Sequence, residues 1–225
     1  MLSLIWLIAA GFFLYEFFLR TFVGSIARGL ISDLHLSAAH FAIMASCYAL
    51  AYGIMQVPVG IIADKYGVKQ AMIFATLLCA LATFLFAHAV NFEQAAAMRF
   101  LMGLGSAFAF VCLLVVASVW FPTRFFGLFA GLSQFVGTLG PVLAGGPLVA
   151  FLAKTGTPWR AALTDVAMIG VVLGILTLLF VRNKPKTYKG APPYLSNDAS
   201  PMWPRLKKLV RNKQVWVVAF YSGTV

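Results

Sequence analysis

The fold of this chain is decided by the stretch Gly60-Ile-Ile-Ala-Asp64-Lys65-Tyr-Gly67-Val-Lys69, which lies between two long apolar runs. The stretch brings two glycines, one acid and two basic residues into a connection that is too short to be a domain. Charged residues concentrated in a short turn between apolar runs are typical of a loop at a membrane surface. The stretch therefore predicts two membrane helices joined by a tight polar turn.

The same turn contains a candidate conformational latch. Gly60 lets another backbone approach closely, and Asp64 suits the positive N-terminal end of a neighbouring helix. Lys65 and Lys69 can pair with acids or with lipid headgroups. We therefore expect Gly60, Asp64, Lys65, Gly67 and Lys69 to make contacts in only one of two conformations. The alternative is a charged turn that only sets the topology.

Composition excludes a water-soluble fold. Hydrophobic residues make up 62% of the 225 residues, charged residues make up 10%, and the mean hydropathy is +0.92. Soluble domains are roughly half apolar and a quarter charged. A chain of this length has too little interior to hide so much apolar surface. The bilayer is therefore the expected solvent for most of the chain, and membrane lipids are expected partners.

Six apolar runs are long enough to cross a bilayer, which takes about 20 helical residues. They lie at about 4–29, 38–62, 69–90, 95–120, 125–152 and 161–181. A seventh run begins near Gln214 and stops at Val225, so it is too short to cross. The sequence predicts an all-α membrane protein with three parts: a six-helix transmembrane bundle over 1–181, a basic cytoplasmic linker over 182–213 and the truncated start of a seventh helix over 214–225.

The distribution of basic residues predicts the orientation. Nine of the 17 Lys and Arg residues fall within 182–213, and the loops after the second and fourth runs carry Lys65, Lys69 and Arg124. Because cytoplasmic loops are enriched in Lys and Arg, we expect these loops and the N-terminus on the cytoplasmic side of a bacterial-type inner membrane. The net charge of +11 comes without a nucleic-acid recognition motif, so no nucleic-acid partner is expected.

Two ionisable residues, Glu16 and Arg20, fall near the middle of the first apolar run. Their i, i+4 spacing places them on one helix face, and ionisable groups at membrane depth cost about 2.5–3.5 kcal/mol each. We expect Arg20 to attract an anionic group of the substrate, and Glu16 to take up a proton or to hold Arg20 when the site is empty. The alternative is a permanent salt bridge that only neutralises both charges.

Further polar residues in the second and fifth runs are candidates for a cavity wall. Tyr48, Tyr52 and Gln56 recur at intervals of four and share one helix face, although they are equally consistent with an aromatic packing stripe. In the fifth run, Gln134, with Ser133 and Thr138, is expected to face a polar cavity. We predict that the substrate is bound by Arg20, Tyr48, Tyr52, Gln56 and Gln134.

Arg99 lies early in the fourth run, near its predicted outer side. One interpretation is an interfacial anchor whose charged end reaches the headgroups. The other is a coupling or gating residue, and Arg99 and Glu16 are the candidates for proton coupling.

Three segments together resemble the major facilitator superfamily. The first is the turn quoted above, the second is Arg99-Phe-Leu-Met-Gly103-Leu-Gly105, and the third is Gly137-Thr-Leu-Gly140-Pro141-Val-Leu-Ala-Gly145-Gly146. The second is similar to a fourth-helix motif whose arginine is linked to proton coupling. The third departs from the antiporter pattern, because three residues rather than two separate Gly-Pro from Gly-Gly.

Within that family, the chain is most similar to the organic-anion and nitrate porter branches, in which the first-helix arginine is associated with anion binding. The similarity lies in Tyr-Glu-Phe-Phe-Leu-Arg20, Tyr52-Gly-Ile-Met-Gln56-Val-Pro58-Val-Gly60 and Trp120-Phe-Pro122-Thr-Arg124. The resemblance implies two six-helix halves around a central site that opens alternately to either side. This chain would supply the N-terminal half, its C-terminal half would be a further partner, and the fragment alone is not expected to transport.

The sequence therefore predicts a secondary active transporter for a small polar solute, an organic anion or an amino acid, with proton symport as the expected coupling. The alternative is a non-transporting sensor or membrane assembly subunit of the same fold. An enzyme is not expected, because no nucleophile–base pair or metal-ligand set occurs at helical spacing. No cofactor and no metal site are predicted.

Overall fold

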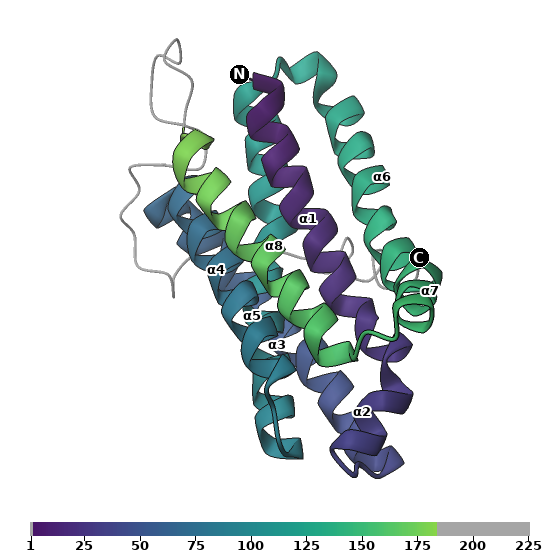
Figure 1. Cartoon of the computed structure of the whole chain (residues 1–225). Coiled ribbons are helices and arrows are strands. Elements are labelled where there is room, and N and C mark those ends of the chain that lie inside the picture. Colours follow the sequence, from purple (N-terminus) through teal and green to yellow (C-terminus); the bar gives the residue numbers. More distant parts are fainter. Residues whose placement is uncertain (1, 184–225) are drawn as a thin grey trace.

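The computed structural model describes residues 2–183, and these residues fold into helices joined by short turns (Figure 1). The helices are α1 (Leu2–Ser25), α2 (Ala27–Asp33), α3 (Ala38–Tyr66), α4 (Val68–Ala87), α5 (Phe92–Trp120), η1 (Thr123–Phe125), α6 (Phe126–Ala144), α7 (Gly146–Thr155) and α8 (Trp159–Phe180). The predicted all-α fold is confirmed. The predicted seventh helix, 214–225, and all but the first two residues of the predicted linker, 182–213, lie outside the described residues.

Six helical segments within the described residues are long and apolar enough to cross a membrane, which agrees with the predicted number. They are Ser3–Ser25, Ala38–Gln56, Val68–Ala87, Phe92–Trp120, Thr123–Thr155 and Trp159–Phe180. Two predicted runs are divided, because 4–29 breaks at Ile26 and 125–152 breaks at Gly145. At the second break, Gly145 and Gly146 precede Pro147, which suits the first turn of a new helix because it has no N–H to leave unbonded.

The turn between α3 and α4 is tighter than the apolar pattern indicated. Helix α3 continues through Pro58 and past the predicted end at residue 62, and it ends at Tyr66. Gly67 then serves as the last cap of α3 and the first cap of α4. Its φ of 84° lies in the left-handed region, which glycine adopts without steric conflict. One glycine therefore reverses the chain between two spans.

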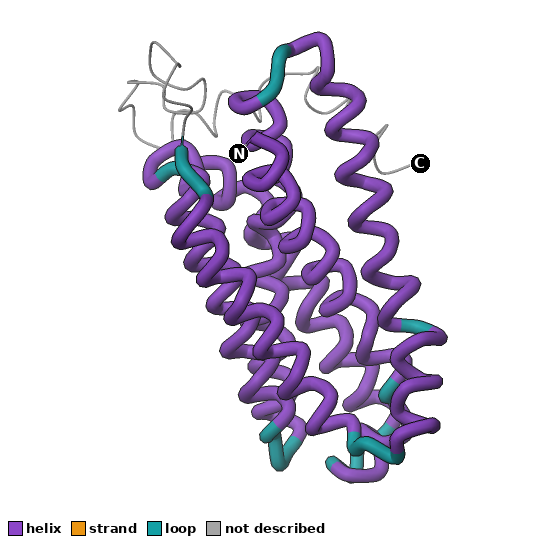
Figure 2. Tube along the Cα trace, turned by 45° about the horizontal axis from the view of Figure 1, so that its top comes forward, coloured by secondary structure: helices purple, strands orange, loops and turns teal. Residues whose placement is uncertain are grey.

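Helix α1 lies at the centre of the packing and contacts α5, α6 and α8 (Figures 1 and 2). On one side α3 packs against α5, and α4 packs against both α5 and α8. The closest approaches occur at glycines. A Cβ at Gly103 of α5 would lie 2.3 Å from the Tyr48 carbonyl oxygen of α3, and one at Gly140 of α6 would lie 2.5 Å from the Leu14 carbonyl oxygen of α1. Small residues at helix crossings are what membrane helices use to pack closely.

A polar cluster fastens the end of the bundle where α2 and α4 end and α8 begins. The Trp159 indole donates to the Asp33 carboxylate at 2.9 Å, and Arg160 pairs with the same carboxylate at 3.6 Å. The Arg160 guanidinium also donates to the Ala87 and Ala89 carbonyl oxygens, both at 2.8 Å. Three helix ends are therefore joined by two consecutive side chains.

Candidate functional site

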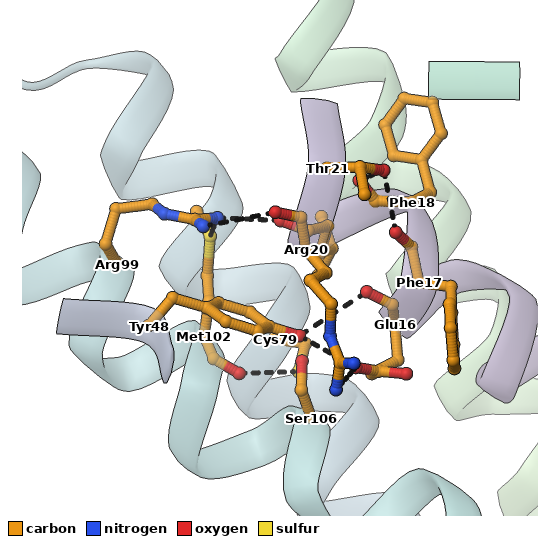
Figure 3. Close-up of polar contacts among 11 residues, drawn as sticks. Glu16, Phe17, Phe18, Arg20, Thr21, Tyr48, Cys79, Arg99, Met102 and Ser106 are labelled. Atoms are coloured by element: carbon orange, nitrogen blue, oxygen red, sulfur yellow. Dashed lines mark hydrogen bonds and ion pairs between the residues drawn. The ribbon is translucent and has the colours of Figure 1, made fainter. Parts of the chain in front are cut away.

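The two ionisable residues of α1 form an ion pair inside the bundle (Figure 3). Arg20 Nη2 lies 3.0 Å from Glu16 Oε1, one helical turn away. The Glu16 side chain is 1% exposed, whereas that of Arg20 is 37% exposed. The Tyr48 hydroxyl on α3 donates to the same Glu16 oxygen at 3.0 Å. The salt bridge expected as the alternative interpretation is thus present, but one of its partners remains open to solutes.

The second carboxylate oxygen of Glu16 has a different environment. Oε2 is buried and has no hydrogen-bond partner among residues 2–183. An unsatisfied buried acceptor costs about 1–3 kcal/mol, and more when it is charged. Protonation of Glu16 would remove the negative charge that makes this burial most costly, and Oε2 is the carboxylate oxygen that no described residue binds.

Arg20 opens onto a pocket of about 200 Å³ that is lined by Arg20, Tyr48, Ala49 and Tyr52. Its guanidinium lies 4.5 Å from the Tyr52 ring centroid and 4.9 Å from that of Phe17. Aromatic faces attract a cation without occupying its N–H donors. The pocket therefore presents a held guanidinium to a solute, which suits a carboxylate.

Arg99 lies in the interior rather than at the predicted interface. Its side chain is among the largest fully buried ones, with a residue exposure of 1%. Nη1 donates to the Leu19 carbonyl oxygen at 2.7 Å, Nη2 to that of Arg20 at 3.5 Å, and the guanidinium lies 4.5 Å from the Tyr48 ring centroid. The interfacial-anchor interpretation is therefore wrong, because no part of this side chain reaches a bundle surface.

The predicted glutamines do not join this pocket. Gln56 and Gln134 are both exposed and do not line it, so their role in binding stays a prediction. Ser133, which was expected to face a cavity, is buried, accepts the Trp6 indole N–H at 3.0 Å and donates to its own helix. Thr138 also donates to its own helix. Sequence periodicity gave the helix faces but not which neighbour covers them.

The predicted latch divides into two sets of residues. At Gly67 and Lys69, the contact is with Asn183, just after α8: the Asn183 side chain lies 2.7 Å from the position of a Gly67 Cβ and accepts the Lys69 backbone N–H at 2.8 Å. Asn183 also donates to Gln70 at 3.1 Å. Asn183 thus caps the start of α4 from a distant part of the chain. No local sequence signal indicated this, because the contact spans 114 residues.

The other latch residues lie on the last turns of α3. A Cβ built at Gly60 would have no atom within 4 Å among the described residues. Asp64 is half-buried, and exposed Lys65 places its ammonium 5.1 Å from the Tyr66 ring centroid. Gly60 therefore has room for a close neighbour that residues 2–183 do not supply.

Six candidate spans around a buried ion pair define a multi-pass membrane protein. The sequence model of the Major Facilitator Superfamily matches residues 7–225, and the chain therefore belongs to that family. It is 29% identical over 92% of its length to the uncharacterized transporter YybO of Bacillus subtilis (strain 168), covering 50% of that protein. It is 26% identical over 79% of its length to the hexuronate transporter of the same organism, covering 42% of that protein.

The fold also matches a solved transporter. A crystal structure of a bacterial homologue of the human lysosomal transporter Spinster, inward-facing and unoccupied, superposes with a TM-score of 0.74. The match covers 96% of this chain and 50% of the other, at 18% identity. The chain thus spans half or less of the length of these proteins and has the fold of one six-helix half.

Proposed function

We propose that this chain is the N-terminal half of a secondary transporter that moves a small organic anion across a bacterial inner membrane, with the N-terminus in the cytoplasm. The observation that carries the proposal is the guanidinium of Arg20, which is held at a pocket by aromatic rings while 37% of its side chain stays exposed. Arg20 pairs with the carboxylate of Glu16, and Arg99 lies against the Tyr48 ring without a carboxylate partner among residues 2–183, so the cluster has an excess positive charge to offer an anion.

A sugar acid is the proposed substrate class. The hexuronate transporter that this chain resembles is named for a sugar that carries one carboxylate and several hydroxyls. Arg20 supplies the planar donor pair that matches a carboxylate, and Tyr52, whose side chain carries a hydroxyl, lines the same pocket. Gln56 and Gln134 are proposed to contribute when the second half closes over them.

Proton symport is the proposed coupling, because Glu16 and a substrate carboxylate would compete for Arg20. Protonation of Glu16 at Oε2 makes the carboxyl neutral and weakens its ion pair with Arg20. The substrate carboxylate then takes the place of Glu16 as the partner of the guanidinium. The substrate's negative charge is thereby matched by the proton on Glu16, and the cluster keeps the same total charge. The latch residues are proposed to bind the second half in only one of the two states.

Uptake into proteoliposomes containing the full-length protein tests the substrate class. We expect labelled glucuronate to be taken up, and unlabelled galacturonate to compete with it. Glucose is the matched control, because it has the same ring and hydroxyls without the carboxylate. Uptake of glucose at a rate similar to that of glucuronate would contradict the proposal.

Glu16→Gln separates coupling from binding. The amide keeps the shape of the side chain and can still accept from Tyr48, but it cannot carry a proton at this site. We expect an inward proton gradient to no longer drive accumulation of glucuronate, while exchange of labelled for unlabelled glucuronate persists. Asp165→Asn, a matched change at an exposed carboxylate of α8, should keep both activities. If Glu16→Gln still accumulates glucuronate against its gradient, Glu16 is not the proton carrier.

A further inference from the structure

Arg99 is a buried cation that no carboxylate within residues 2–183 pairs with. The two ion pairs within residues 2–183 are Arg20 with Glu16 and Arg160 with Asp33, and neither includes Arg99. An unpaired charge is costly to bury at membrane depth. The Arg99 guanidinium instead uses backbone carbonyl oxygens and aromatic faces, and its Nε has no hydrogen-bond partner among the described residues. The contacts of the Arg99 guanidinium indicate what this buried charge does.

The first set of contacts fixes the backbone from which Arg20 projects. The guanidinium of Arg99 donates through one nitrogen to the Leu19 carbonyl oxygen and through the other to that of Arg20. Consecutive residues of a helix are turned about 100° from each other. A rigid fork that reaches both carbonyls therefore restricts the rotation of α1 at the residue that faces the pocket.

The second set of contacts leads to Glu16. A chain of contacts runs from Arg99 through Tyr48 to Glu16. The Arg99 guanidinium lies 4.5 Å from the Tyr48 ring centroid, and the Tyr48 hydroxyl donates to Glu16 Oε1. Figure 3 shows Arg99 on the far side of Tyr48 from the Arg20 guanidinium. The same guanidinium therefore supports Arg20 through the backbone and Glu16 through a ring.

We propose that Arg99 is a positioning residue, which holds Arg20 and Glu16 in register across the contact between α1, α3 and α5, and carries neither substrate nor proton. Arg99 does not line the pocket, whereas Arg20 and Tyr48 do. The proposal rests on the proposed function, because the positioned residues are those that bind the anion and the proton there.

Arg99→Lys is the variant that tests the proposal. Lysine keeps the positive charge but replaces the rigid fork by a single flexible ammonium. In proteoliposomes we expect the KM for glucuronate to rise about tenfold in both exchange and proton-driven uptake, because the α1 backbone then no longer fixes the Arg20 guanidinium toward the substrate. Loss of proton-driven uptake with an unchanged KM in exchange would place Arg99 in proton coupling, and that result would overturn the positioning role.

Arg160→Lys is the matched control. Arg160 also donates to two carbonyl oxygens and lies over an aromatic ring, at 4.4 Å from the Trp159 centroid, but it does so between α4 and α8, away from the pair. We expect Arg160→Lys to lower thermal stability and leave the KM within about twofold of wild type. Equal KM values for the two lysine variants would show that Arg99 has only a structural role.

A measurement independent of transport separates this proposal from the proposed function. Thermal unfolding of Arg99→Lys, Tyr48→Phe and the double variant forms a double-mutant cycle. We expect the destabilisation of the double variant to be smaller than the sum of the single effects, because loss of the Arg99 fork already loosens the ring that Tyr48→Phe uncouples from Glu16. Arg160→Lys combined with Tyr48→Phe should be additive. Additive shifts for both pairs would overturn the positioning role even if glucuronate is carried, whereas wild type that carries no uronate would overturn only the proposed function.

Discussion

Replacing Gly103 with alanine is expected to break the contact between α3 and α5 and to remove most folded protein from the membrane. The new Cβ would lie 2.3 Å from the Tyr48 carbonyl oxygen and 2.9 Å from the Ala51 Cβ. A backbone atom cannot turn away as a flexible side chain does, so the two helices must separate. Overpacking of this kind costs about 1–3 kcal/mol, and here it also displaces the residue that holds Glu16. Thermal unfolding of the detergent-solubilised full-length protein, together with the folded fraction by gel filtration, measures the effect.

Gly60→Ala is the control for that substitution. Gly60 and Gly103 lie on neighbouring helices, but a Cβ at Gly60 meets nothing within 4 Å among the described residues. We expect wild-type thermal stability for Gly60→Ala, together with reduced uptake if the second half of the protein approaches at this glycine. Equal stability of Gly60→Ala and Gly103→Ala would show that the close approach at Gly103 does not limit packing.

Much of the fold was predictable because the bilayer leaves few alternatives. Spans need long apolar runs, and backbone groups in lipid must bond within their own helix. Hydropathy alone therefore located six spans, and the charged residues after the second run indicated a turn, which the structure confines to Gly67. It did not find the breaks at Ile26 and Gly145, because a short interruption hardly changes the mean hydropathy of a window. The apolar pattern also stopped α3 four residues early, since Asp64 and Lys65 are helical but charged.

The candidate site was only partly predictable. Periodicity placed Glu16 with Arg20 on one face, and the structure joins them. The partner of that pair, the Tyr48 hydroxyl, comes from another helix, and helical spacing within one run contains no information on such contacts. The same limit applies to Arg99, whose acceptors are backbone carbonyls 79 and 80 positions away. Every residue has a carbonyl, so no residue type in the sequence marks where a buried arginine will bind.

Arg20→Ala is expected to produce the largest functional loss. Hydrogen bonds to charged groups contribute about 1.5–3 kcal/mol, so losing the guanidinium should raise the KM for glucuronate roughly tenfold to a hundredfold. The variant also removes the cation that pairs with Glu16 in the empty site. We therefore expect net uptake to become undetectable at substrate concentrations near the wild-type KM. Uptake of labelled glucuronate by proteoliposomes, normalised to the reconstituted protein, provides the measurement.

Arg20→Lys separates charge from geometry at the same position. Lysine keeps a positive charge near Glu16, but it offers one ammonium instead of the planar fork that matches a carboxylate. If the guanidinium binds the substrate directly, the lysine variant should remain folded and show an intermediate KM, between wild type and Arg20→Ala. Wild-type uptake by Arg20→Ala would remove Arg20 from the binding site and leave its pair with Glu16 as a structural salt bridge. Tyr48 binds Glu16 independently of Arg20. The thermal stability of Arg20→Ala relative to wild type then measures the contribution of the Glu16–Arg20 ion pair to folding.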